Sequence, residues 1–270
     1  MPTALVLSIR PQVAADVPAH LGRAAHAAVL RLIGQHSPPL AARIHDELGP
    51  KPLTVSSVSG LAGRSPTARV SPAQAHSLRV TLLTPELEQA AAGWEAAALP
   101  PIDLDGHLWQ VEAVARTPEQ HPWAGSASYE QLAGPALARA ADPPRRWDIE
   151  FAAPVTFRQR GMNAPLPTPD LVFGSLLEKW NAFAPLALPE EVRRFASECM
   201  AVSRFELRSA PVPAKAGAMQ VGAVGLCSYT AVNRDHYWMA CVDVLAHLAF
   251  YSGVGAATTR GLGQARLREG

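Results

Sequence analysis

A glycine-rich stretch near the end of the sequence has the composition of a phosphate-binding loop. Its four glycines follow the spacing G-x-G-x5-G-x-G: Gly253, Gly255, Gly261 and Gly263. Glycine tolerates positive φ and close backbone approach, and Thr258, Thr259 and Arg260 lie between the glycines. Hydroxyls, a guanidinium and free backbone N–H groups bind phosphate oxygens. A tight helix-to-strand connection that binds nothing explains the same spacing, and the lack of G-K-[ST] after a strand argues against a P-loop.

A histidine and a lysine near a predicted helix end are the second candidate. His45 lies in the segment LAARIHDELGPK (residues 40–51), in which the helix pattern ends at a Gly-Pro pair and Lys51 follows at once. A helix C-terminus favours a protonated imidazole, and a chain reversal brings a lysine and a histidine toward one phosphate. The alternative is a surface histidine, solvated beside the two acidic residues that follow it.

These residue types suit cleavage of RNA without a metal. Attack by the neighbouring 2′-hydroxyl needs a base for the hydroxyl proton, a cation for the phosphate oxygens and an acid for the departing 5′-oxygen. Histidine supplies either proton role near neutral pH, typically for roughly 10²–10⁴-fold in rate, and lysine or arginine supplies the cation. His45 and Lys51 leave one proton transfer unassigned. The histidines form no H-E-x-x-H or H-x3-H motif, so neither a metal site nor another cofactor is predicted.

The composition predicts a globular protein with local rather than global charge. The chain has 270 residues, 48% of them hydrophobic, and a formal net charge of +1, so a nucleic-acid partner would have to bind at local cationic sites. Three cysteines without C-x-x-C spacing suit a reducing cytoplasm. The first residues have no basic region typical of a signal peptide, and the apolar run 238–250 is too short and polar to span a bilayer.

Hydrophobic periodicity predicts the same order of elements in both halves of the chain. In the first half it predicts strand 3–9, helices 18–34 and 40–48, strands 53–59 and 77–83, helix 85–97 and strand 107–116. In the second half it predicts strands 146–151 and 155–158, helices 170–183 and 189–198, strands 201–209 and 220–232, helix 235–251 and strand 263–268. The repeated β-α-β-β-α-β order is the ferredoxin-like plan. We therefore expect an α+β fold with two tandem ferredoxin-like (RRM-like) domains, 1–120 and 146–270, joined by a linker at 121–145.

A group of arginines around the start of the second domain is a further candidate for phosphate contacts. Its members are Arg139, Arg145, Arg146, Arg158 and Arg160. The alternative is a set of solvated arginines balanced by nearby acidic residues. Trp147 and Trp180 lie in periodic apolar segments, which predicts that both belong to the core.

The chain resembles the CRISPR-associated endoribonucleases that process precursor CRISPR RNA, in the superfamily of repeat-associated mysterious proteins. Three segments carry the resemblance: LAARIHDELGPKPLTVS (40–56), WDIEFAAPVTFRQRGMNAPLPTPDLVFGSLLEKWNAF (147–183) and the glycine-rich loop (253–263). The resemblance implies a tandem ferredoxin-like fold. It also implies metal-independent cleavage of CRISPR repeat RNA that leaves a 5′-hydroxyl and a 2′,3′-cyclic phosphate.

The resemblance also assigns roles to residues. It makes His45 the residue of general acid–base catalysis, with Lys51 beside it as in some members, and the glycine-rich loop an RNA-binding element. Some members have a tyrosine on the first helix, at a place that falls near Leu30 here, and no tyrosine is close by. His26, His36 or an arginine could fill that role, or one histidine suffices. CRISPR repeat RNA is the implied partner; an effector complex as a second partner, and a monomer or a homodimer, are left open.

Two other functions agree with the same residues. One is a protein of this fold that binds CRISPR RNA without cutting it, which the missing tyrosine favours. The other is an unrelated metabolic enzyme whose glycine-rich loop takes a nucleotide. Cleavage of repeat RNA separates the first from the nuclease, and tight binding of ATP or a dinucleotide without RNA affinity would identify the second.

Overall fold

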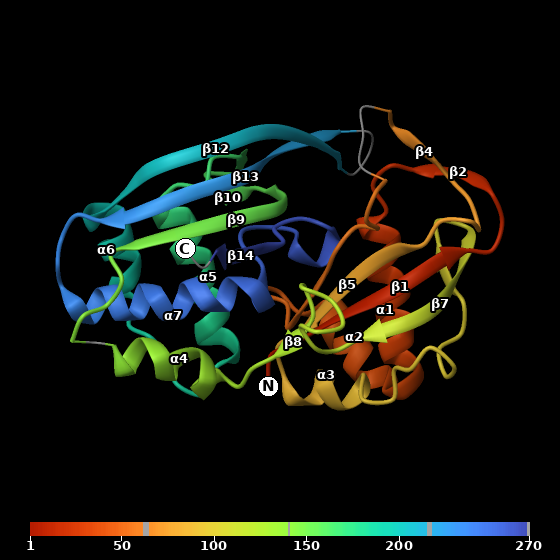
Figure 1. Cartoon of the computed structure of the whole chain (residues 1–270), viewed down its shortest axis with the longest axis horizontal. Helices are drawn as coiled ribbons and strands as arrows, with labels where there is room; N and C mark the ends of the chain where they lie inside the picture. Colours follow the sequence, from red (N-terminus) through yellow and green to blue (C-terminus); the bar gives the residue numbers. More distant parts are fainter. Residues whose placement is uncertain (62–64, 140, 215–217, 269–270) are drawn as a thin grey trace. The chain divides into compact units, whose positions relative to one another are not determined.

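The computed structural model of the chain describes residues 1–61, 65–139, 141–214 and 218–268 (Figure 1). The chain divides into two compact units. Unit 1 comprises Met1–Ser126 and Thr259–Gly261, and unit 2 comprises Ala127–Thr258 and Leu262–Gly270. The short segment Thr259–Gly261, in the middle of the glycine-rich stretch, therefore groups with residues that are far from it in sequence.

Unit 1 has an antiparallel sheet with helices packed on it. Its strands are β1 (Thr3–Pro11), β2 (Ala15–Pro18), β3 (Leu53–Val55), β4 (Thr67–Val70), β5 (His76–Leu82), β6 (Ile102–Leu104), β7 (His107–Ala115) and β8 (Gly125–Ser126). Its helices are α1 (Gly22–His36), α2 (Pro38–Asp46) and α3 (Pro85–Ala90). The main sheet has the order β3-β5-β1-β7-β6. Alternate residues of β1, Leu5, Leu7 and Ile9, are fully buried in the core beneath α1.

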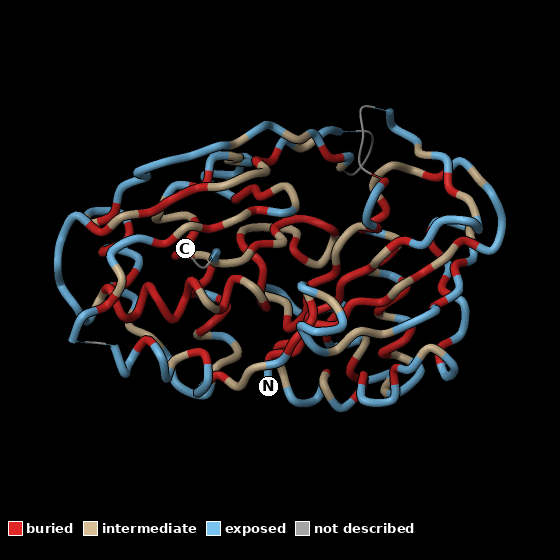
Figure 2. Tube along the Cα trace, viewed as in Figure 1, coloured by how far each residue is buried: buried red, intermediate tan, exposed pale blue. Residues whose placement is uncertain are grey.

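Unit 2 repeats this plan. Its strands are β9 (Arg146–Val155), β10 (Phe157–Gln159), β11 (Met162–Ala164), β12 (Met200–Pro213), β13 (Met219–Ala231) and β14 (Ala265–Arg268). Its helices are α4 (Tyr129–Ala138), α5 (Pro169–Phe183), α6 (Glu191–Cys199) and α7 (His236–Ser252). The 3₁₀ helix η2 (Thr258–Arg260) is divided, with Thr258 in unit 2 and the next two residues in unit 1. The sheet order is β12-β13-β9-β14. Helix α7 is buried along most of its length (Figure 2).

The strand orders confirm the tandem ferredoxin-like fold. In each unit the second and third strands of the motif are neighbours, the third pairs with the first, and the fourth pairs with the other side of the first: β3-β5-β1-β7 and β12-β13-β9-β14. Every pairing among these strands is antiparallel. The predicted core tryptophans are also confirmed, since Trp147 is 1% and Trp180 3% exposed.

Several predicted boundaries were wrong. The helix expected at 40–48 is α2, which starts two residues earlier because Pro38 fits the first turn of a helix. The helix expected at 85–97 ends at Ala90, and the strand expected at 53–59 ends at Val55. Segment 121–145, expected as a linker, contains the helix α4, where Ser128 and Gln131 form a capping box.

Candidate active site

Lys51 closes the end of the helix that carries His45. Its Nζ donates to the carbonyl oxygens of Ile44 (2.7 Å) and His45 (3.3 Å), and also to that of Glu47. The last carbonyls of a helix have no partner within the helix and carry partial negative charge, which an ammonium offsets. His45 is exposed in the last turn of α2. The chain reversal therefore brings Lys51 to the backbone carbonyls at this helix end, and the meeting of both side chains with one phosphate stays a prediction.

His26 connects this helix end with the glycine-rich stretch. The side chain lies half-buried on α1, and its Nδ1 is buried with no hydrogen-bond partner among the described residues. Burial is the main cause that lowers the pKa of His26 to about 4, and the positive charges of Arg260, Lys51 and His45 lower it further. Such interactions fade over a Debye length of roughly 8–10 Å. One unpartnered imidazole nitrogen thus lies in the same neighbourhood as His45, Lys51 and Arg260, all within unit 1.

Close backbone contacts hold the Arg260–Gly261 segment beside α1. Gly261 forms a parallel bridge with Ser56, and its N–H donates to the carbonyl of Val55 (2.8 Å). A Cβ on Gly22, the first residue of α1, would lie 2.2 Å from the carbonyl oxygen of Arg260. Gly22 was not among the predicted site residues, because nothing in the local sequence indicates which backbone will cross it.

The four glycines of the stretch all take part in hydrogen bonds within the chain. The N–H groups of all four donate within the chain: Gly253 to Ala249 O, Gly255 to Ser175 Oγ, Gly261 to Val55 O and Gly263 to Pro154 O. The expectation of many free N–H groups is therefore wrong at the glycines. All four have φ between 61° and 88°, a region that L side chains rarely adopt. The part of these glycines in RNA binding, together with that of Thr258, Thr259 and Arg260, stays a prediction.

The predicted arginine group is spread over several environments of unit 2. Arg139 donates to Asp243 (3.0 Å), and Arg145 donates to the carbonyl of Ala231 (3.2 Å). Arg158 is exposed on β10, and Arg160 occupies the positive-φ turn between β10 and β11. A contact of Arg145, Arg146 or Arg158 with RNA stays a prediction.

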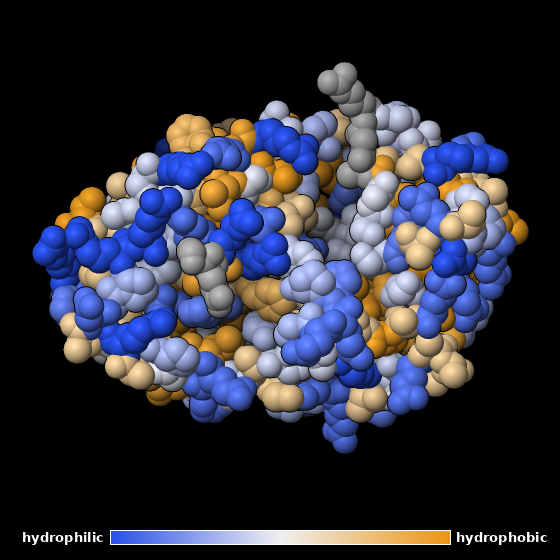
Figure 3. Space-filling model, in the orientation of Figure 1, coloured by the Kyte–Doolittle hydropathy of each residue, from blue (hydrophilic) through white to orange (hydrophobic). Residues whose placement is uncertain are grey.

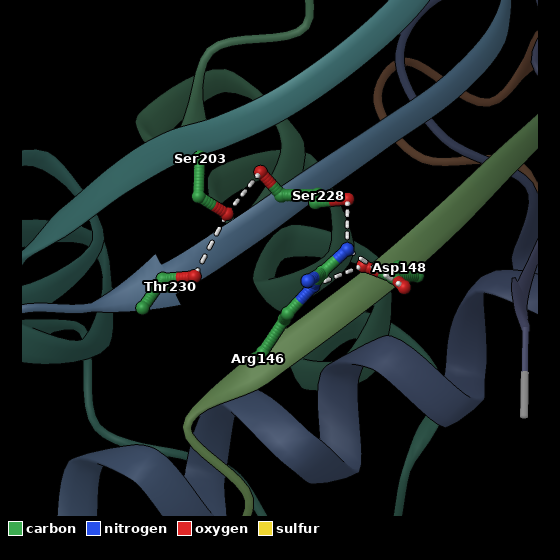
Figure 4. Close-up of polar contacts among 5 residues, drawn as sticks. All are labelled: Arg146, Asp148, Ser203, Ser228 and Thr230. Atoms are coloured by element: carbon green, nitrogen blue, oxygen red, sulfur yellow. Dashed lines mark hydrogen bonds and ion pairs between the residues drawn. The ribbon is translucent and has the colours of Figure 1, made fainter. Parts of the chain in front are cut away.

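Arg146 belongs to a polar network on the sheet (Figure 4). It donates to Asp148 through Nε (2.8 Å) and to Ser228 Oγ through Nη2 (3.1 Å). Ser203 Oγ accepts from Thr230 Oγ1 and donates to the carbonyl of Ser228. Partial burial acts to raise the pKa of Asp148, but the hydrogen bonds of Arg146 and Ser228 outweigh it and lower the pKa. The alternation along β9 turns Trp147 into the core and Arg146 and Asp148 to the opposite face. Hydrophilic and apolar residues are interspersed on the face of the molecule that Figure 3 shows.

The described residues contain neither a metal-ligand cluster nor a helix suited to cross a membrane. Within the described ranges, no cluster of three or more histidine, cysteine, aspartate or glutamate residues is arranged to hold a metal ion. No helix in the described part of the chain combines the length and apolar character that a membrane span needs.

The strand orders define a tandem ferredoxin-like protein, in which Lys51 lies against the end of the helix that carries His45. Two family models match the chain: the CRISPR Cas6 N-terminal domain over residues 1–134 and the CRISPR-associated endoribonuclease Cas6 over residues 149–265. The chain belongs to the Cas6 family.

Solved structures and curated proteins agree with this assignment. A Cas6 product complex, whose protein comes from Thermus thermophilus, is 27% identical, with a TM-score of 0.80 over 99% of this chain and 100% of that one. A second Cas6 product complex is 30% identical, with a TM-score of 0.77 over 99% of both chains. The CRISPR-associated endoribonucleases Cas6 of two Mycobacterium tuberculosis strains, CDC 1551 / Oshkosh and ATCC 25618 / H37Rv, are 26% identical over 194 residues. That match covers 70% of this chain but only 58% of these curated relatives.

Proposed function

We propose that this chain is a metal-independent endoribonuclease that cuts CRISPR repeat RNA by attack of a 2′-hydroxyl on the adjacent phosphate. The family supports RNA cleavage, and the solved Cas6 relatives are described as product and substrate-mimic complexes. The observation that carries the proposal is the neighbourhood of His26. There an imidazole with an unpartnered nitrogen shares one region with His45, Lys51 and Arg260.

The two histidines divide the proton transfers. A pKa of about 4 keeps His26 neutral at pH 7. Its Nδ1 is buried, so the other ring nitrogen, Nε2, is the one assigned to accept the proton of the 2′-hydroxyl. The 2′-oxygen then bonds to phosphorus while the bond from phosphorus to the 5′-oxygen breaks, and His45 gives a proton to that oxygen. The products carry a 2′,3′-cyclic phosphate and a 5′-hydroxyl. A bound phosphate raises the pKa of a nearby histidine, which brings His26 closer to the value at which a general base is most effective.

The cations stabilise the charge that the phosphate oxygens gain during attack. Arg260 and Lys51 both act on His26 and therefore lie within electrostatic reach of a phosphate bound there. Lys51 also donates to carbonyl oxygens at the end of α2. In that position it stabilises the phosphate through its charge and not through a direct hydrogen bond. Each role in the reaction is filled by a side chain of a type suited to it, which is why the proposal includes no metal.

A non-cleaving RNA-binding protein is the second candidate. It is favoured by the commitment of Lys51 to backbone carbonyls and by the lack of tyrosine on α1. In that case the same surface would hold repeat RNA without reacting.

Incubation with repeat RNA in excess chelator separates the two candidates. We expect cleavage that yields cyclic-phosphate ends and stops when the nucleotide 5′ to the scissile phosphate lacks its 2′-hydroxyl. The variant His45→Ala should lose cleavage and keep RNA affinity, and His236→Ala, at the exposed start of α7, is the matched control. Binding without cleavage by the parent protein would favour the second candidate, and cleavage by His45→Ala at the parent rate would refute the assignment of His45.

A further inference from the structure

A buried lysine lies beneath the start of the glycine-rich stretch. Lys179 of α5 is 8% exposed, and its Nζ donates to the carbonyl oxygens of Ser252 (3.0 Å) and Gly253 (2.9 Å). The carbonyl of Gly255 lies at 3.5 Å, at the limit of a hydrogen bond. An ammonium has three N–H donors, so this set of oxygens accounts for all of them. All of these residues belong to unit 2.

The three carbonyls converge because the helix α7 ends abruptly. Gly253 caps α7 with φ 61° and turns the chain out of the helix. The last carbonyls of a helix carry partial negative charge and lack helical partners. The tight turn brings further carbonyl oxygens close to these. Without a cation between them, the mutual repulsion of the oxygens would open the turn.

The same helix also accepts the N–H of Gly255. Ser175 Oγ receives that N–H at 2.9 Å, and Ser175 and Lys179 are four residues apart, so they lie on one face of α5. A Cβ on Gly255 would lie 2.4 Å from the carbonyl oxygen of Thr156. One face of α5 therefore fixes the peptide groups on both sides of Gly255, and close packing leaves them little room to shift.

We propose that Lys179 is a positioning residue for RNA binding: its ammonium fixes the turn Ser252–Gly255, from which the chain runs on to Thr258–Arg260. The inference rests on the proposed function, since it assumes that the protein binds RNA. Lys179 itself is buried and does not touch the RNA. Lys179 affects RNA affinity by fixing the backbone conformation of the loop, whereas Arg260 affects it through its own charge.

Charge at Lys179 gives the proposal a measurable signature. Burial lowers the pKa of Lys179 to about 7, while the adjacent Glu178 acts in the opposite direction. Glu178 in turn pairs with Arg193 of α6 (2.9 Å). The three carbonyls favour the ammonium as well. Loss of the Lys179 proton as pH rises removes one donor and directs a lone pair at a carbonyl oxygen. RNA affinity should therefore fall as the pH rises through about 7.

The experiment measures affinity for a repeat RNA whose cleavage site carries a 2′-deoxynucleotide. We expect Lys179→Met to weaken binding about tenfold, as a displacement of loop contacts by a fraction of an ångström would, with an unchanged slope of log affinity against log salt. Arg260→Glu should instead make that slope shallower by about 1, since one phosphate contact is lost. Between pH 6 and 9 the affinity of the parent should fall more than that of Lys179→Met, because only the parent can lose the ammonium at position 179.

A core variant of the same helix separates positioning from general destabilisation. Leu177→Ala removes a fully buried side chain of α5, and it should keep the parent affinity at a comparable loss of stability. If Lys179→Met does not fold, Ser175→Ala removes the acceptor of the Gly255 N–H, and it should weaken RNA binding severalfold. Parent-like affinity of Lys179→Met, or of Ser175→Ala when only that variant folds, would overturn the inference alone. A parent protein that binds no repeat RNA would overturn the proposed function and this inference with it.

Discussion

Replacement of Gly22 by alanine tests whether the Arg260–Gly261 segment must lie against α1. The added Cβ would be 2.2 Å from the carbonyl oxygen of Arg260, 2.5 Å from its carbonyl carbon and 2.9 Å from Gly261 Cα. Ordinary contacts between carbon and oxygen are about 3.3–3.6 Å, so the segment has to move by roughly 1 Å. All three obstructing atoms belong to the backbone, and no side-chain rotation relieves the clash.

The magnitude follows from this displacement. Overpacking costs about 1–3 kcal/mol of stability, and a misplacement of about 1 Å can cost about 10²-fold in rate. Single-turnover cleavage of repeat RNA, together with urea unfolding, measures both effects. Gly34→Ala on the same helix is the matched control, because its Cβ would meet only Ala41 Cβ at an ordinary 3.5 Å. That variant should keep the parent rate and gain about 0.5–1 kcal/mol of stability. Equal cleavage rates for Gly22→Ala and Gly34→Ala would refute the reasoning.

Three further predictions concern charge and burial. Arg260→Glu should weaken RNA binding and make its salt dependence shallower by about one unit of slope. The same change at the exposed Arg194 of α6 should do neither. An unchanged slope for Arg260→Glu would mean that the side chain contacts no phosphate. Because the pKa of His26 is lowered, the folded state binds fewer protons than the unfolded state between about pH 4 and 6.5. The free energy of unfolding should therefore rise with pH through this window, by about 1–2 kcal/mol after solvent screening. His26→Ala should remove this contribution, and an identical pH dependence of the two proteins would contradict it. Asp243 is 1% exposed and accepts hydrogen bonds from Trp147 Nε1 and Arg139 at 3.0 Å each. Asp243→Ala should therefore lower the free energy of unfolding, measured in urea, by about 2–4 kcal/mol. A loss no larger than that of the exposed Asp142→Ala would show that the buried network contributes little.

Much of the fold followed from periodicity, because each half of the chain builds one core from alternating strands and amphipathic helices. The strands at Thr3–Pro11 and His107–Ala115 and the helix at Pro169–Phe183 all lie close to their predicted places. The small two-stranded sheet of β2 and β4 was missed, because short, polar strands have little periodic signal. The same holds for β6, which joins β7 through a turn at Asp105 and Gly106, both at positive φ.

The site was only partly predictable for a different reason. His45 and Lys51 are six residues apart, so a helix end was enough to predict their proximity. Gly22 and Arg260 meet through tertiary packing, which no local pattern encodes. Lys179 did leave a signal, since it occupies the apolar stripe of α5, seven residues after Val172 and three after Leu176. A lysine at such a place indicates a buried cation that needs acceptors.

The most direct test of the proposed mechanism is a comparison of His26→Ala, His45→Ala and the double variant in single-turnover cleavage of repeat RNA with chelator present. Groups that act as one unit show non-additive losses. We therefore predict that each single variant loses at least about 10²-fold in rate, that RNA affinity is kept, and that the double variant is little slower than the slower single one. Parent-like cleavage by His26→Ala, or losses that multiply in the double variant, would contradict a shared role of the two histidines at one phosphate.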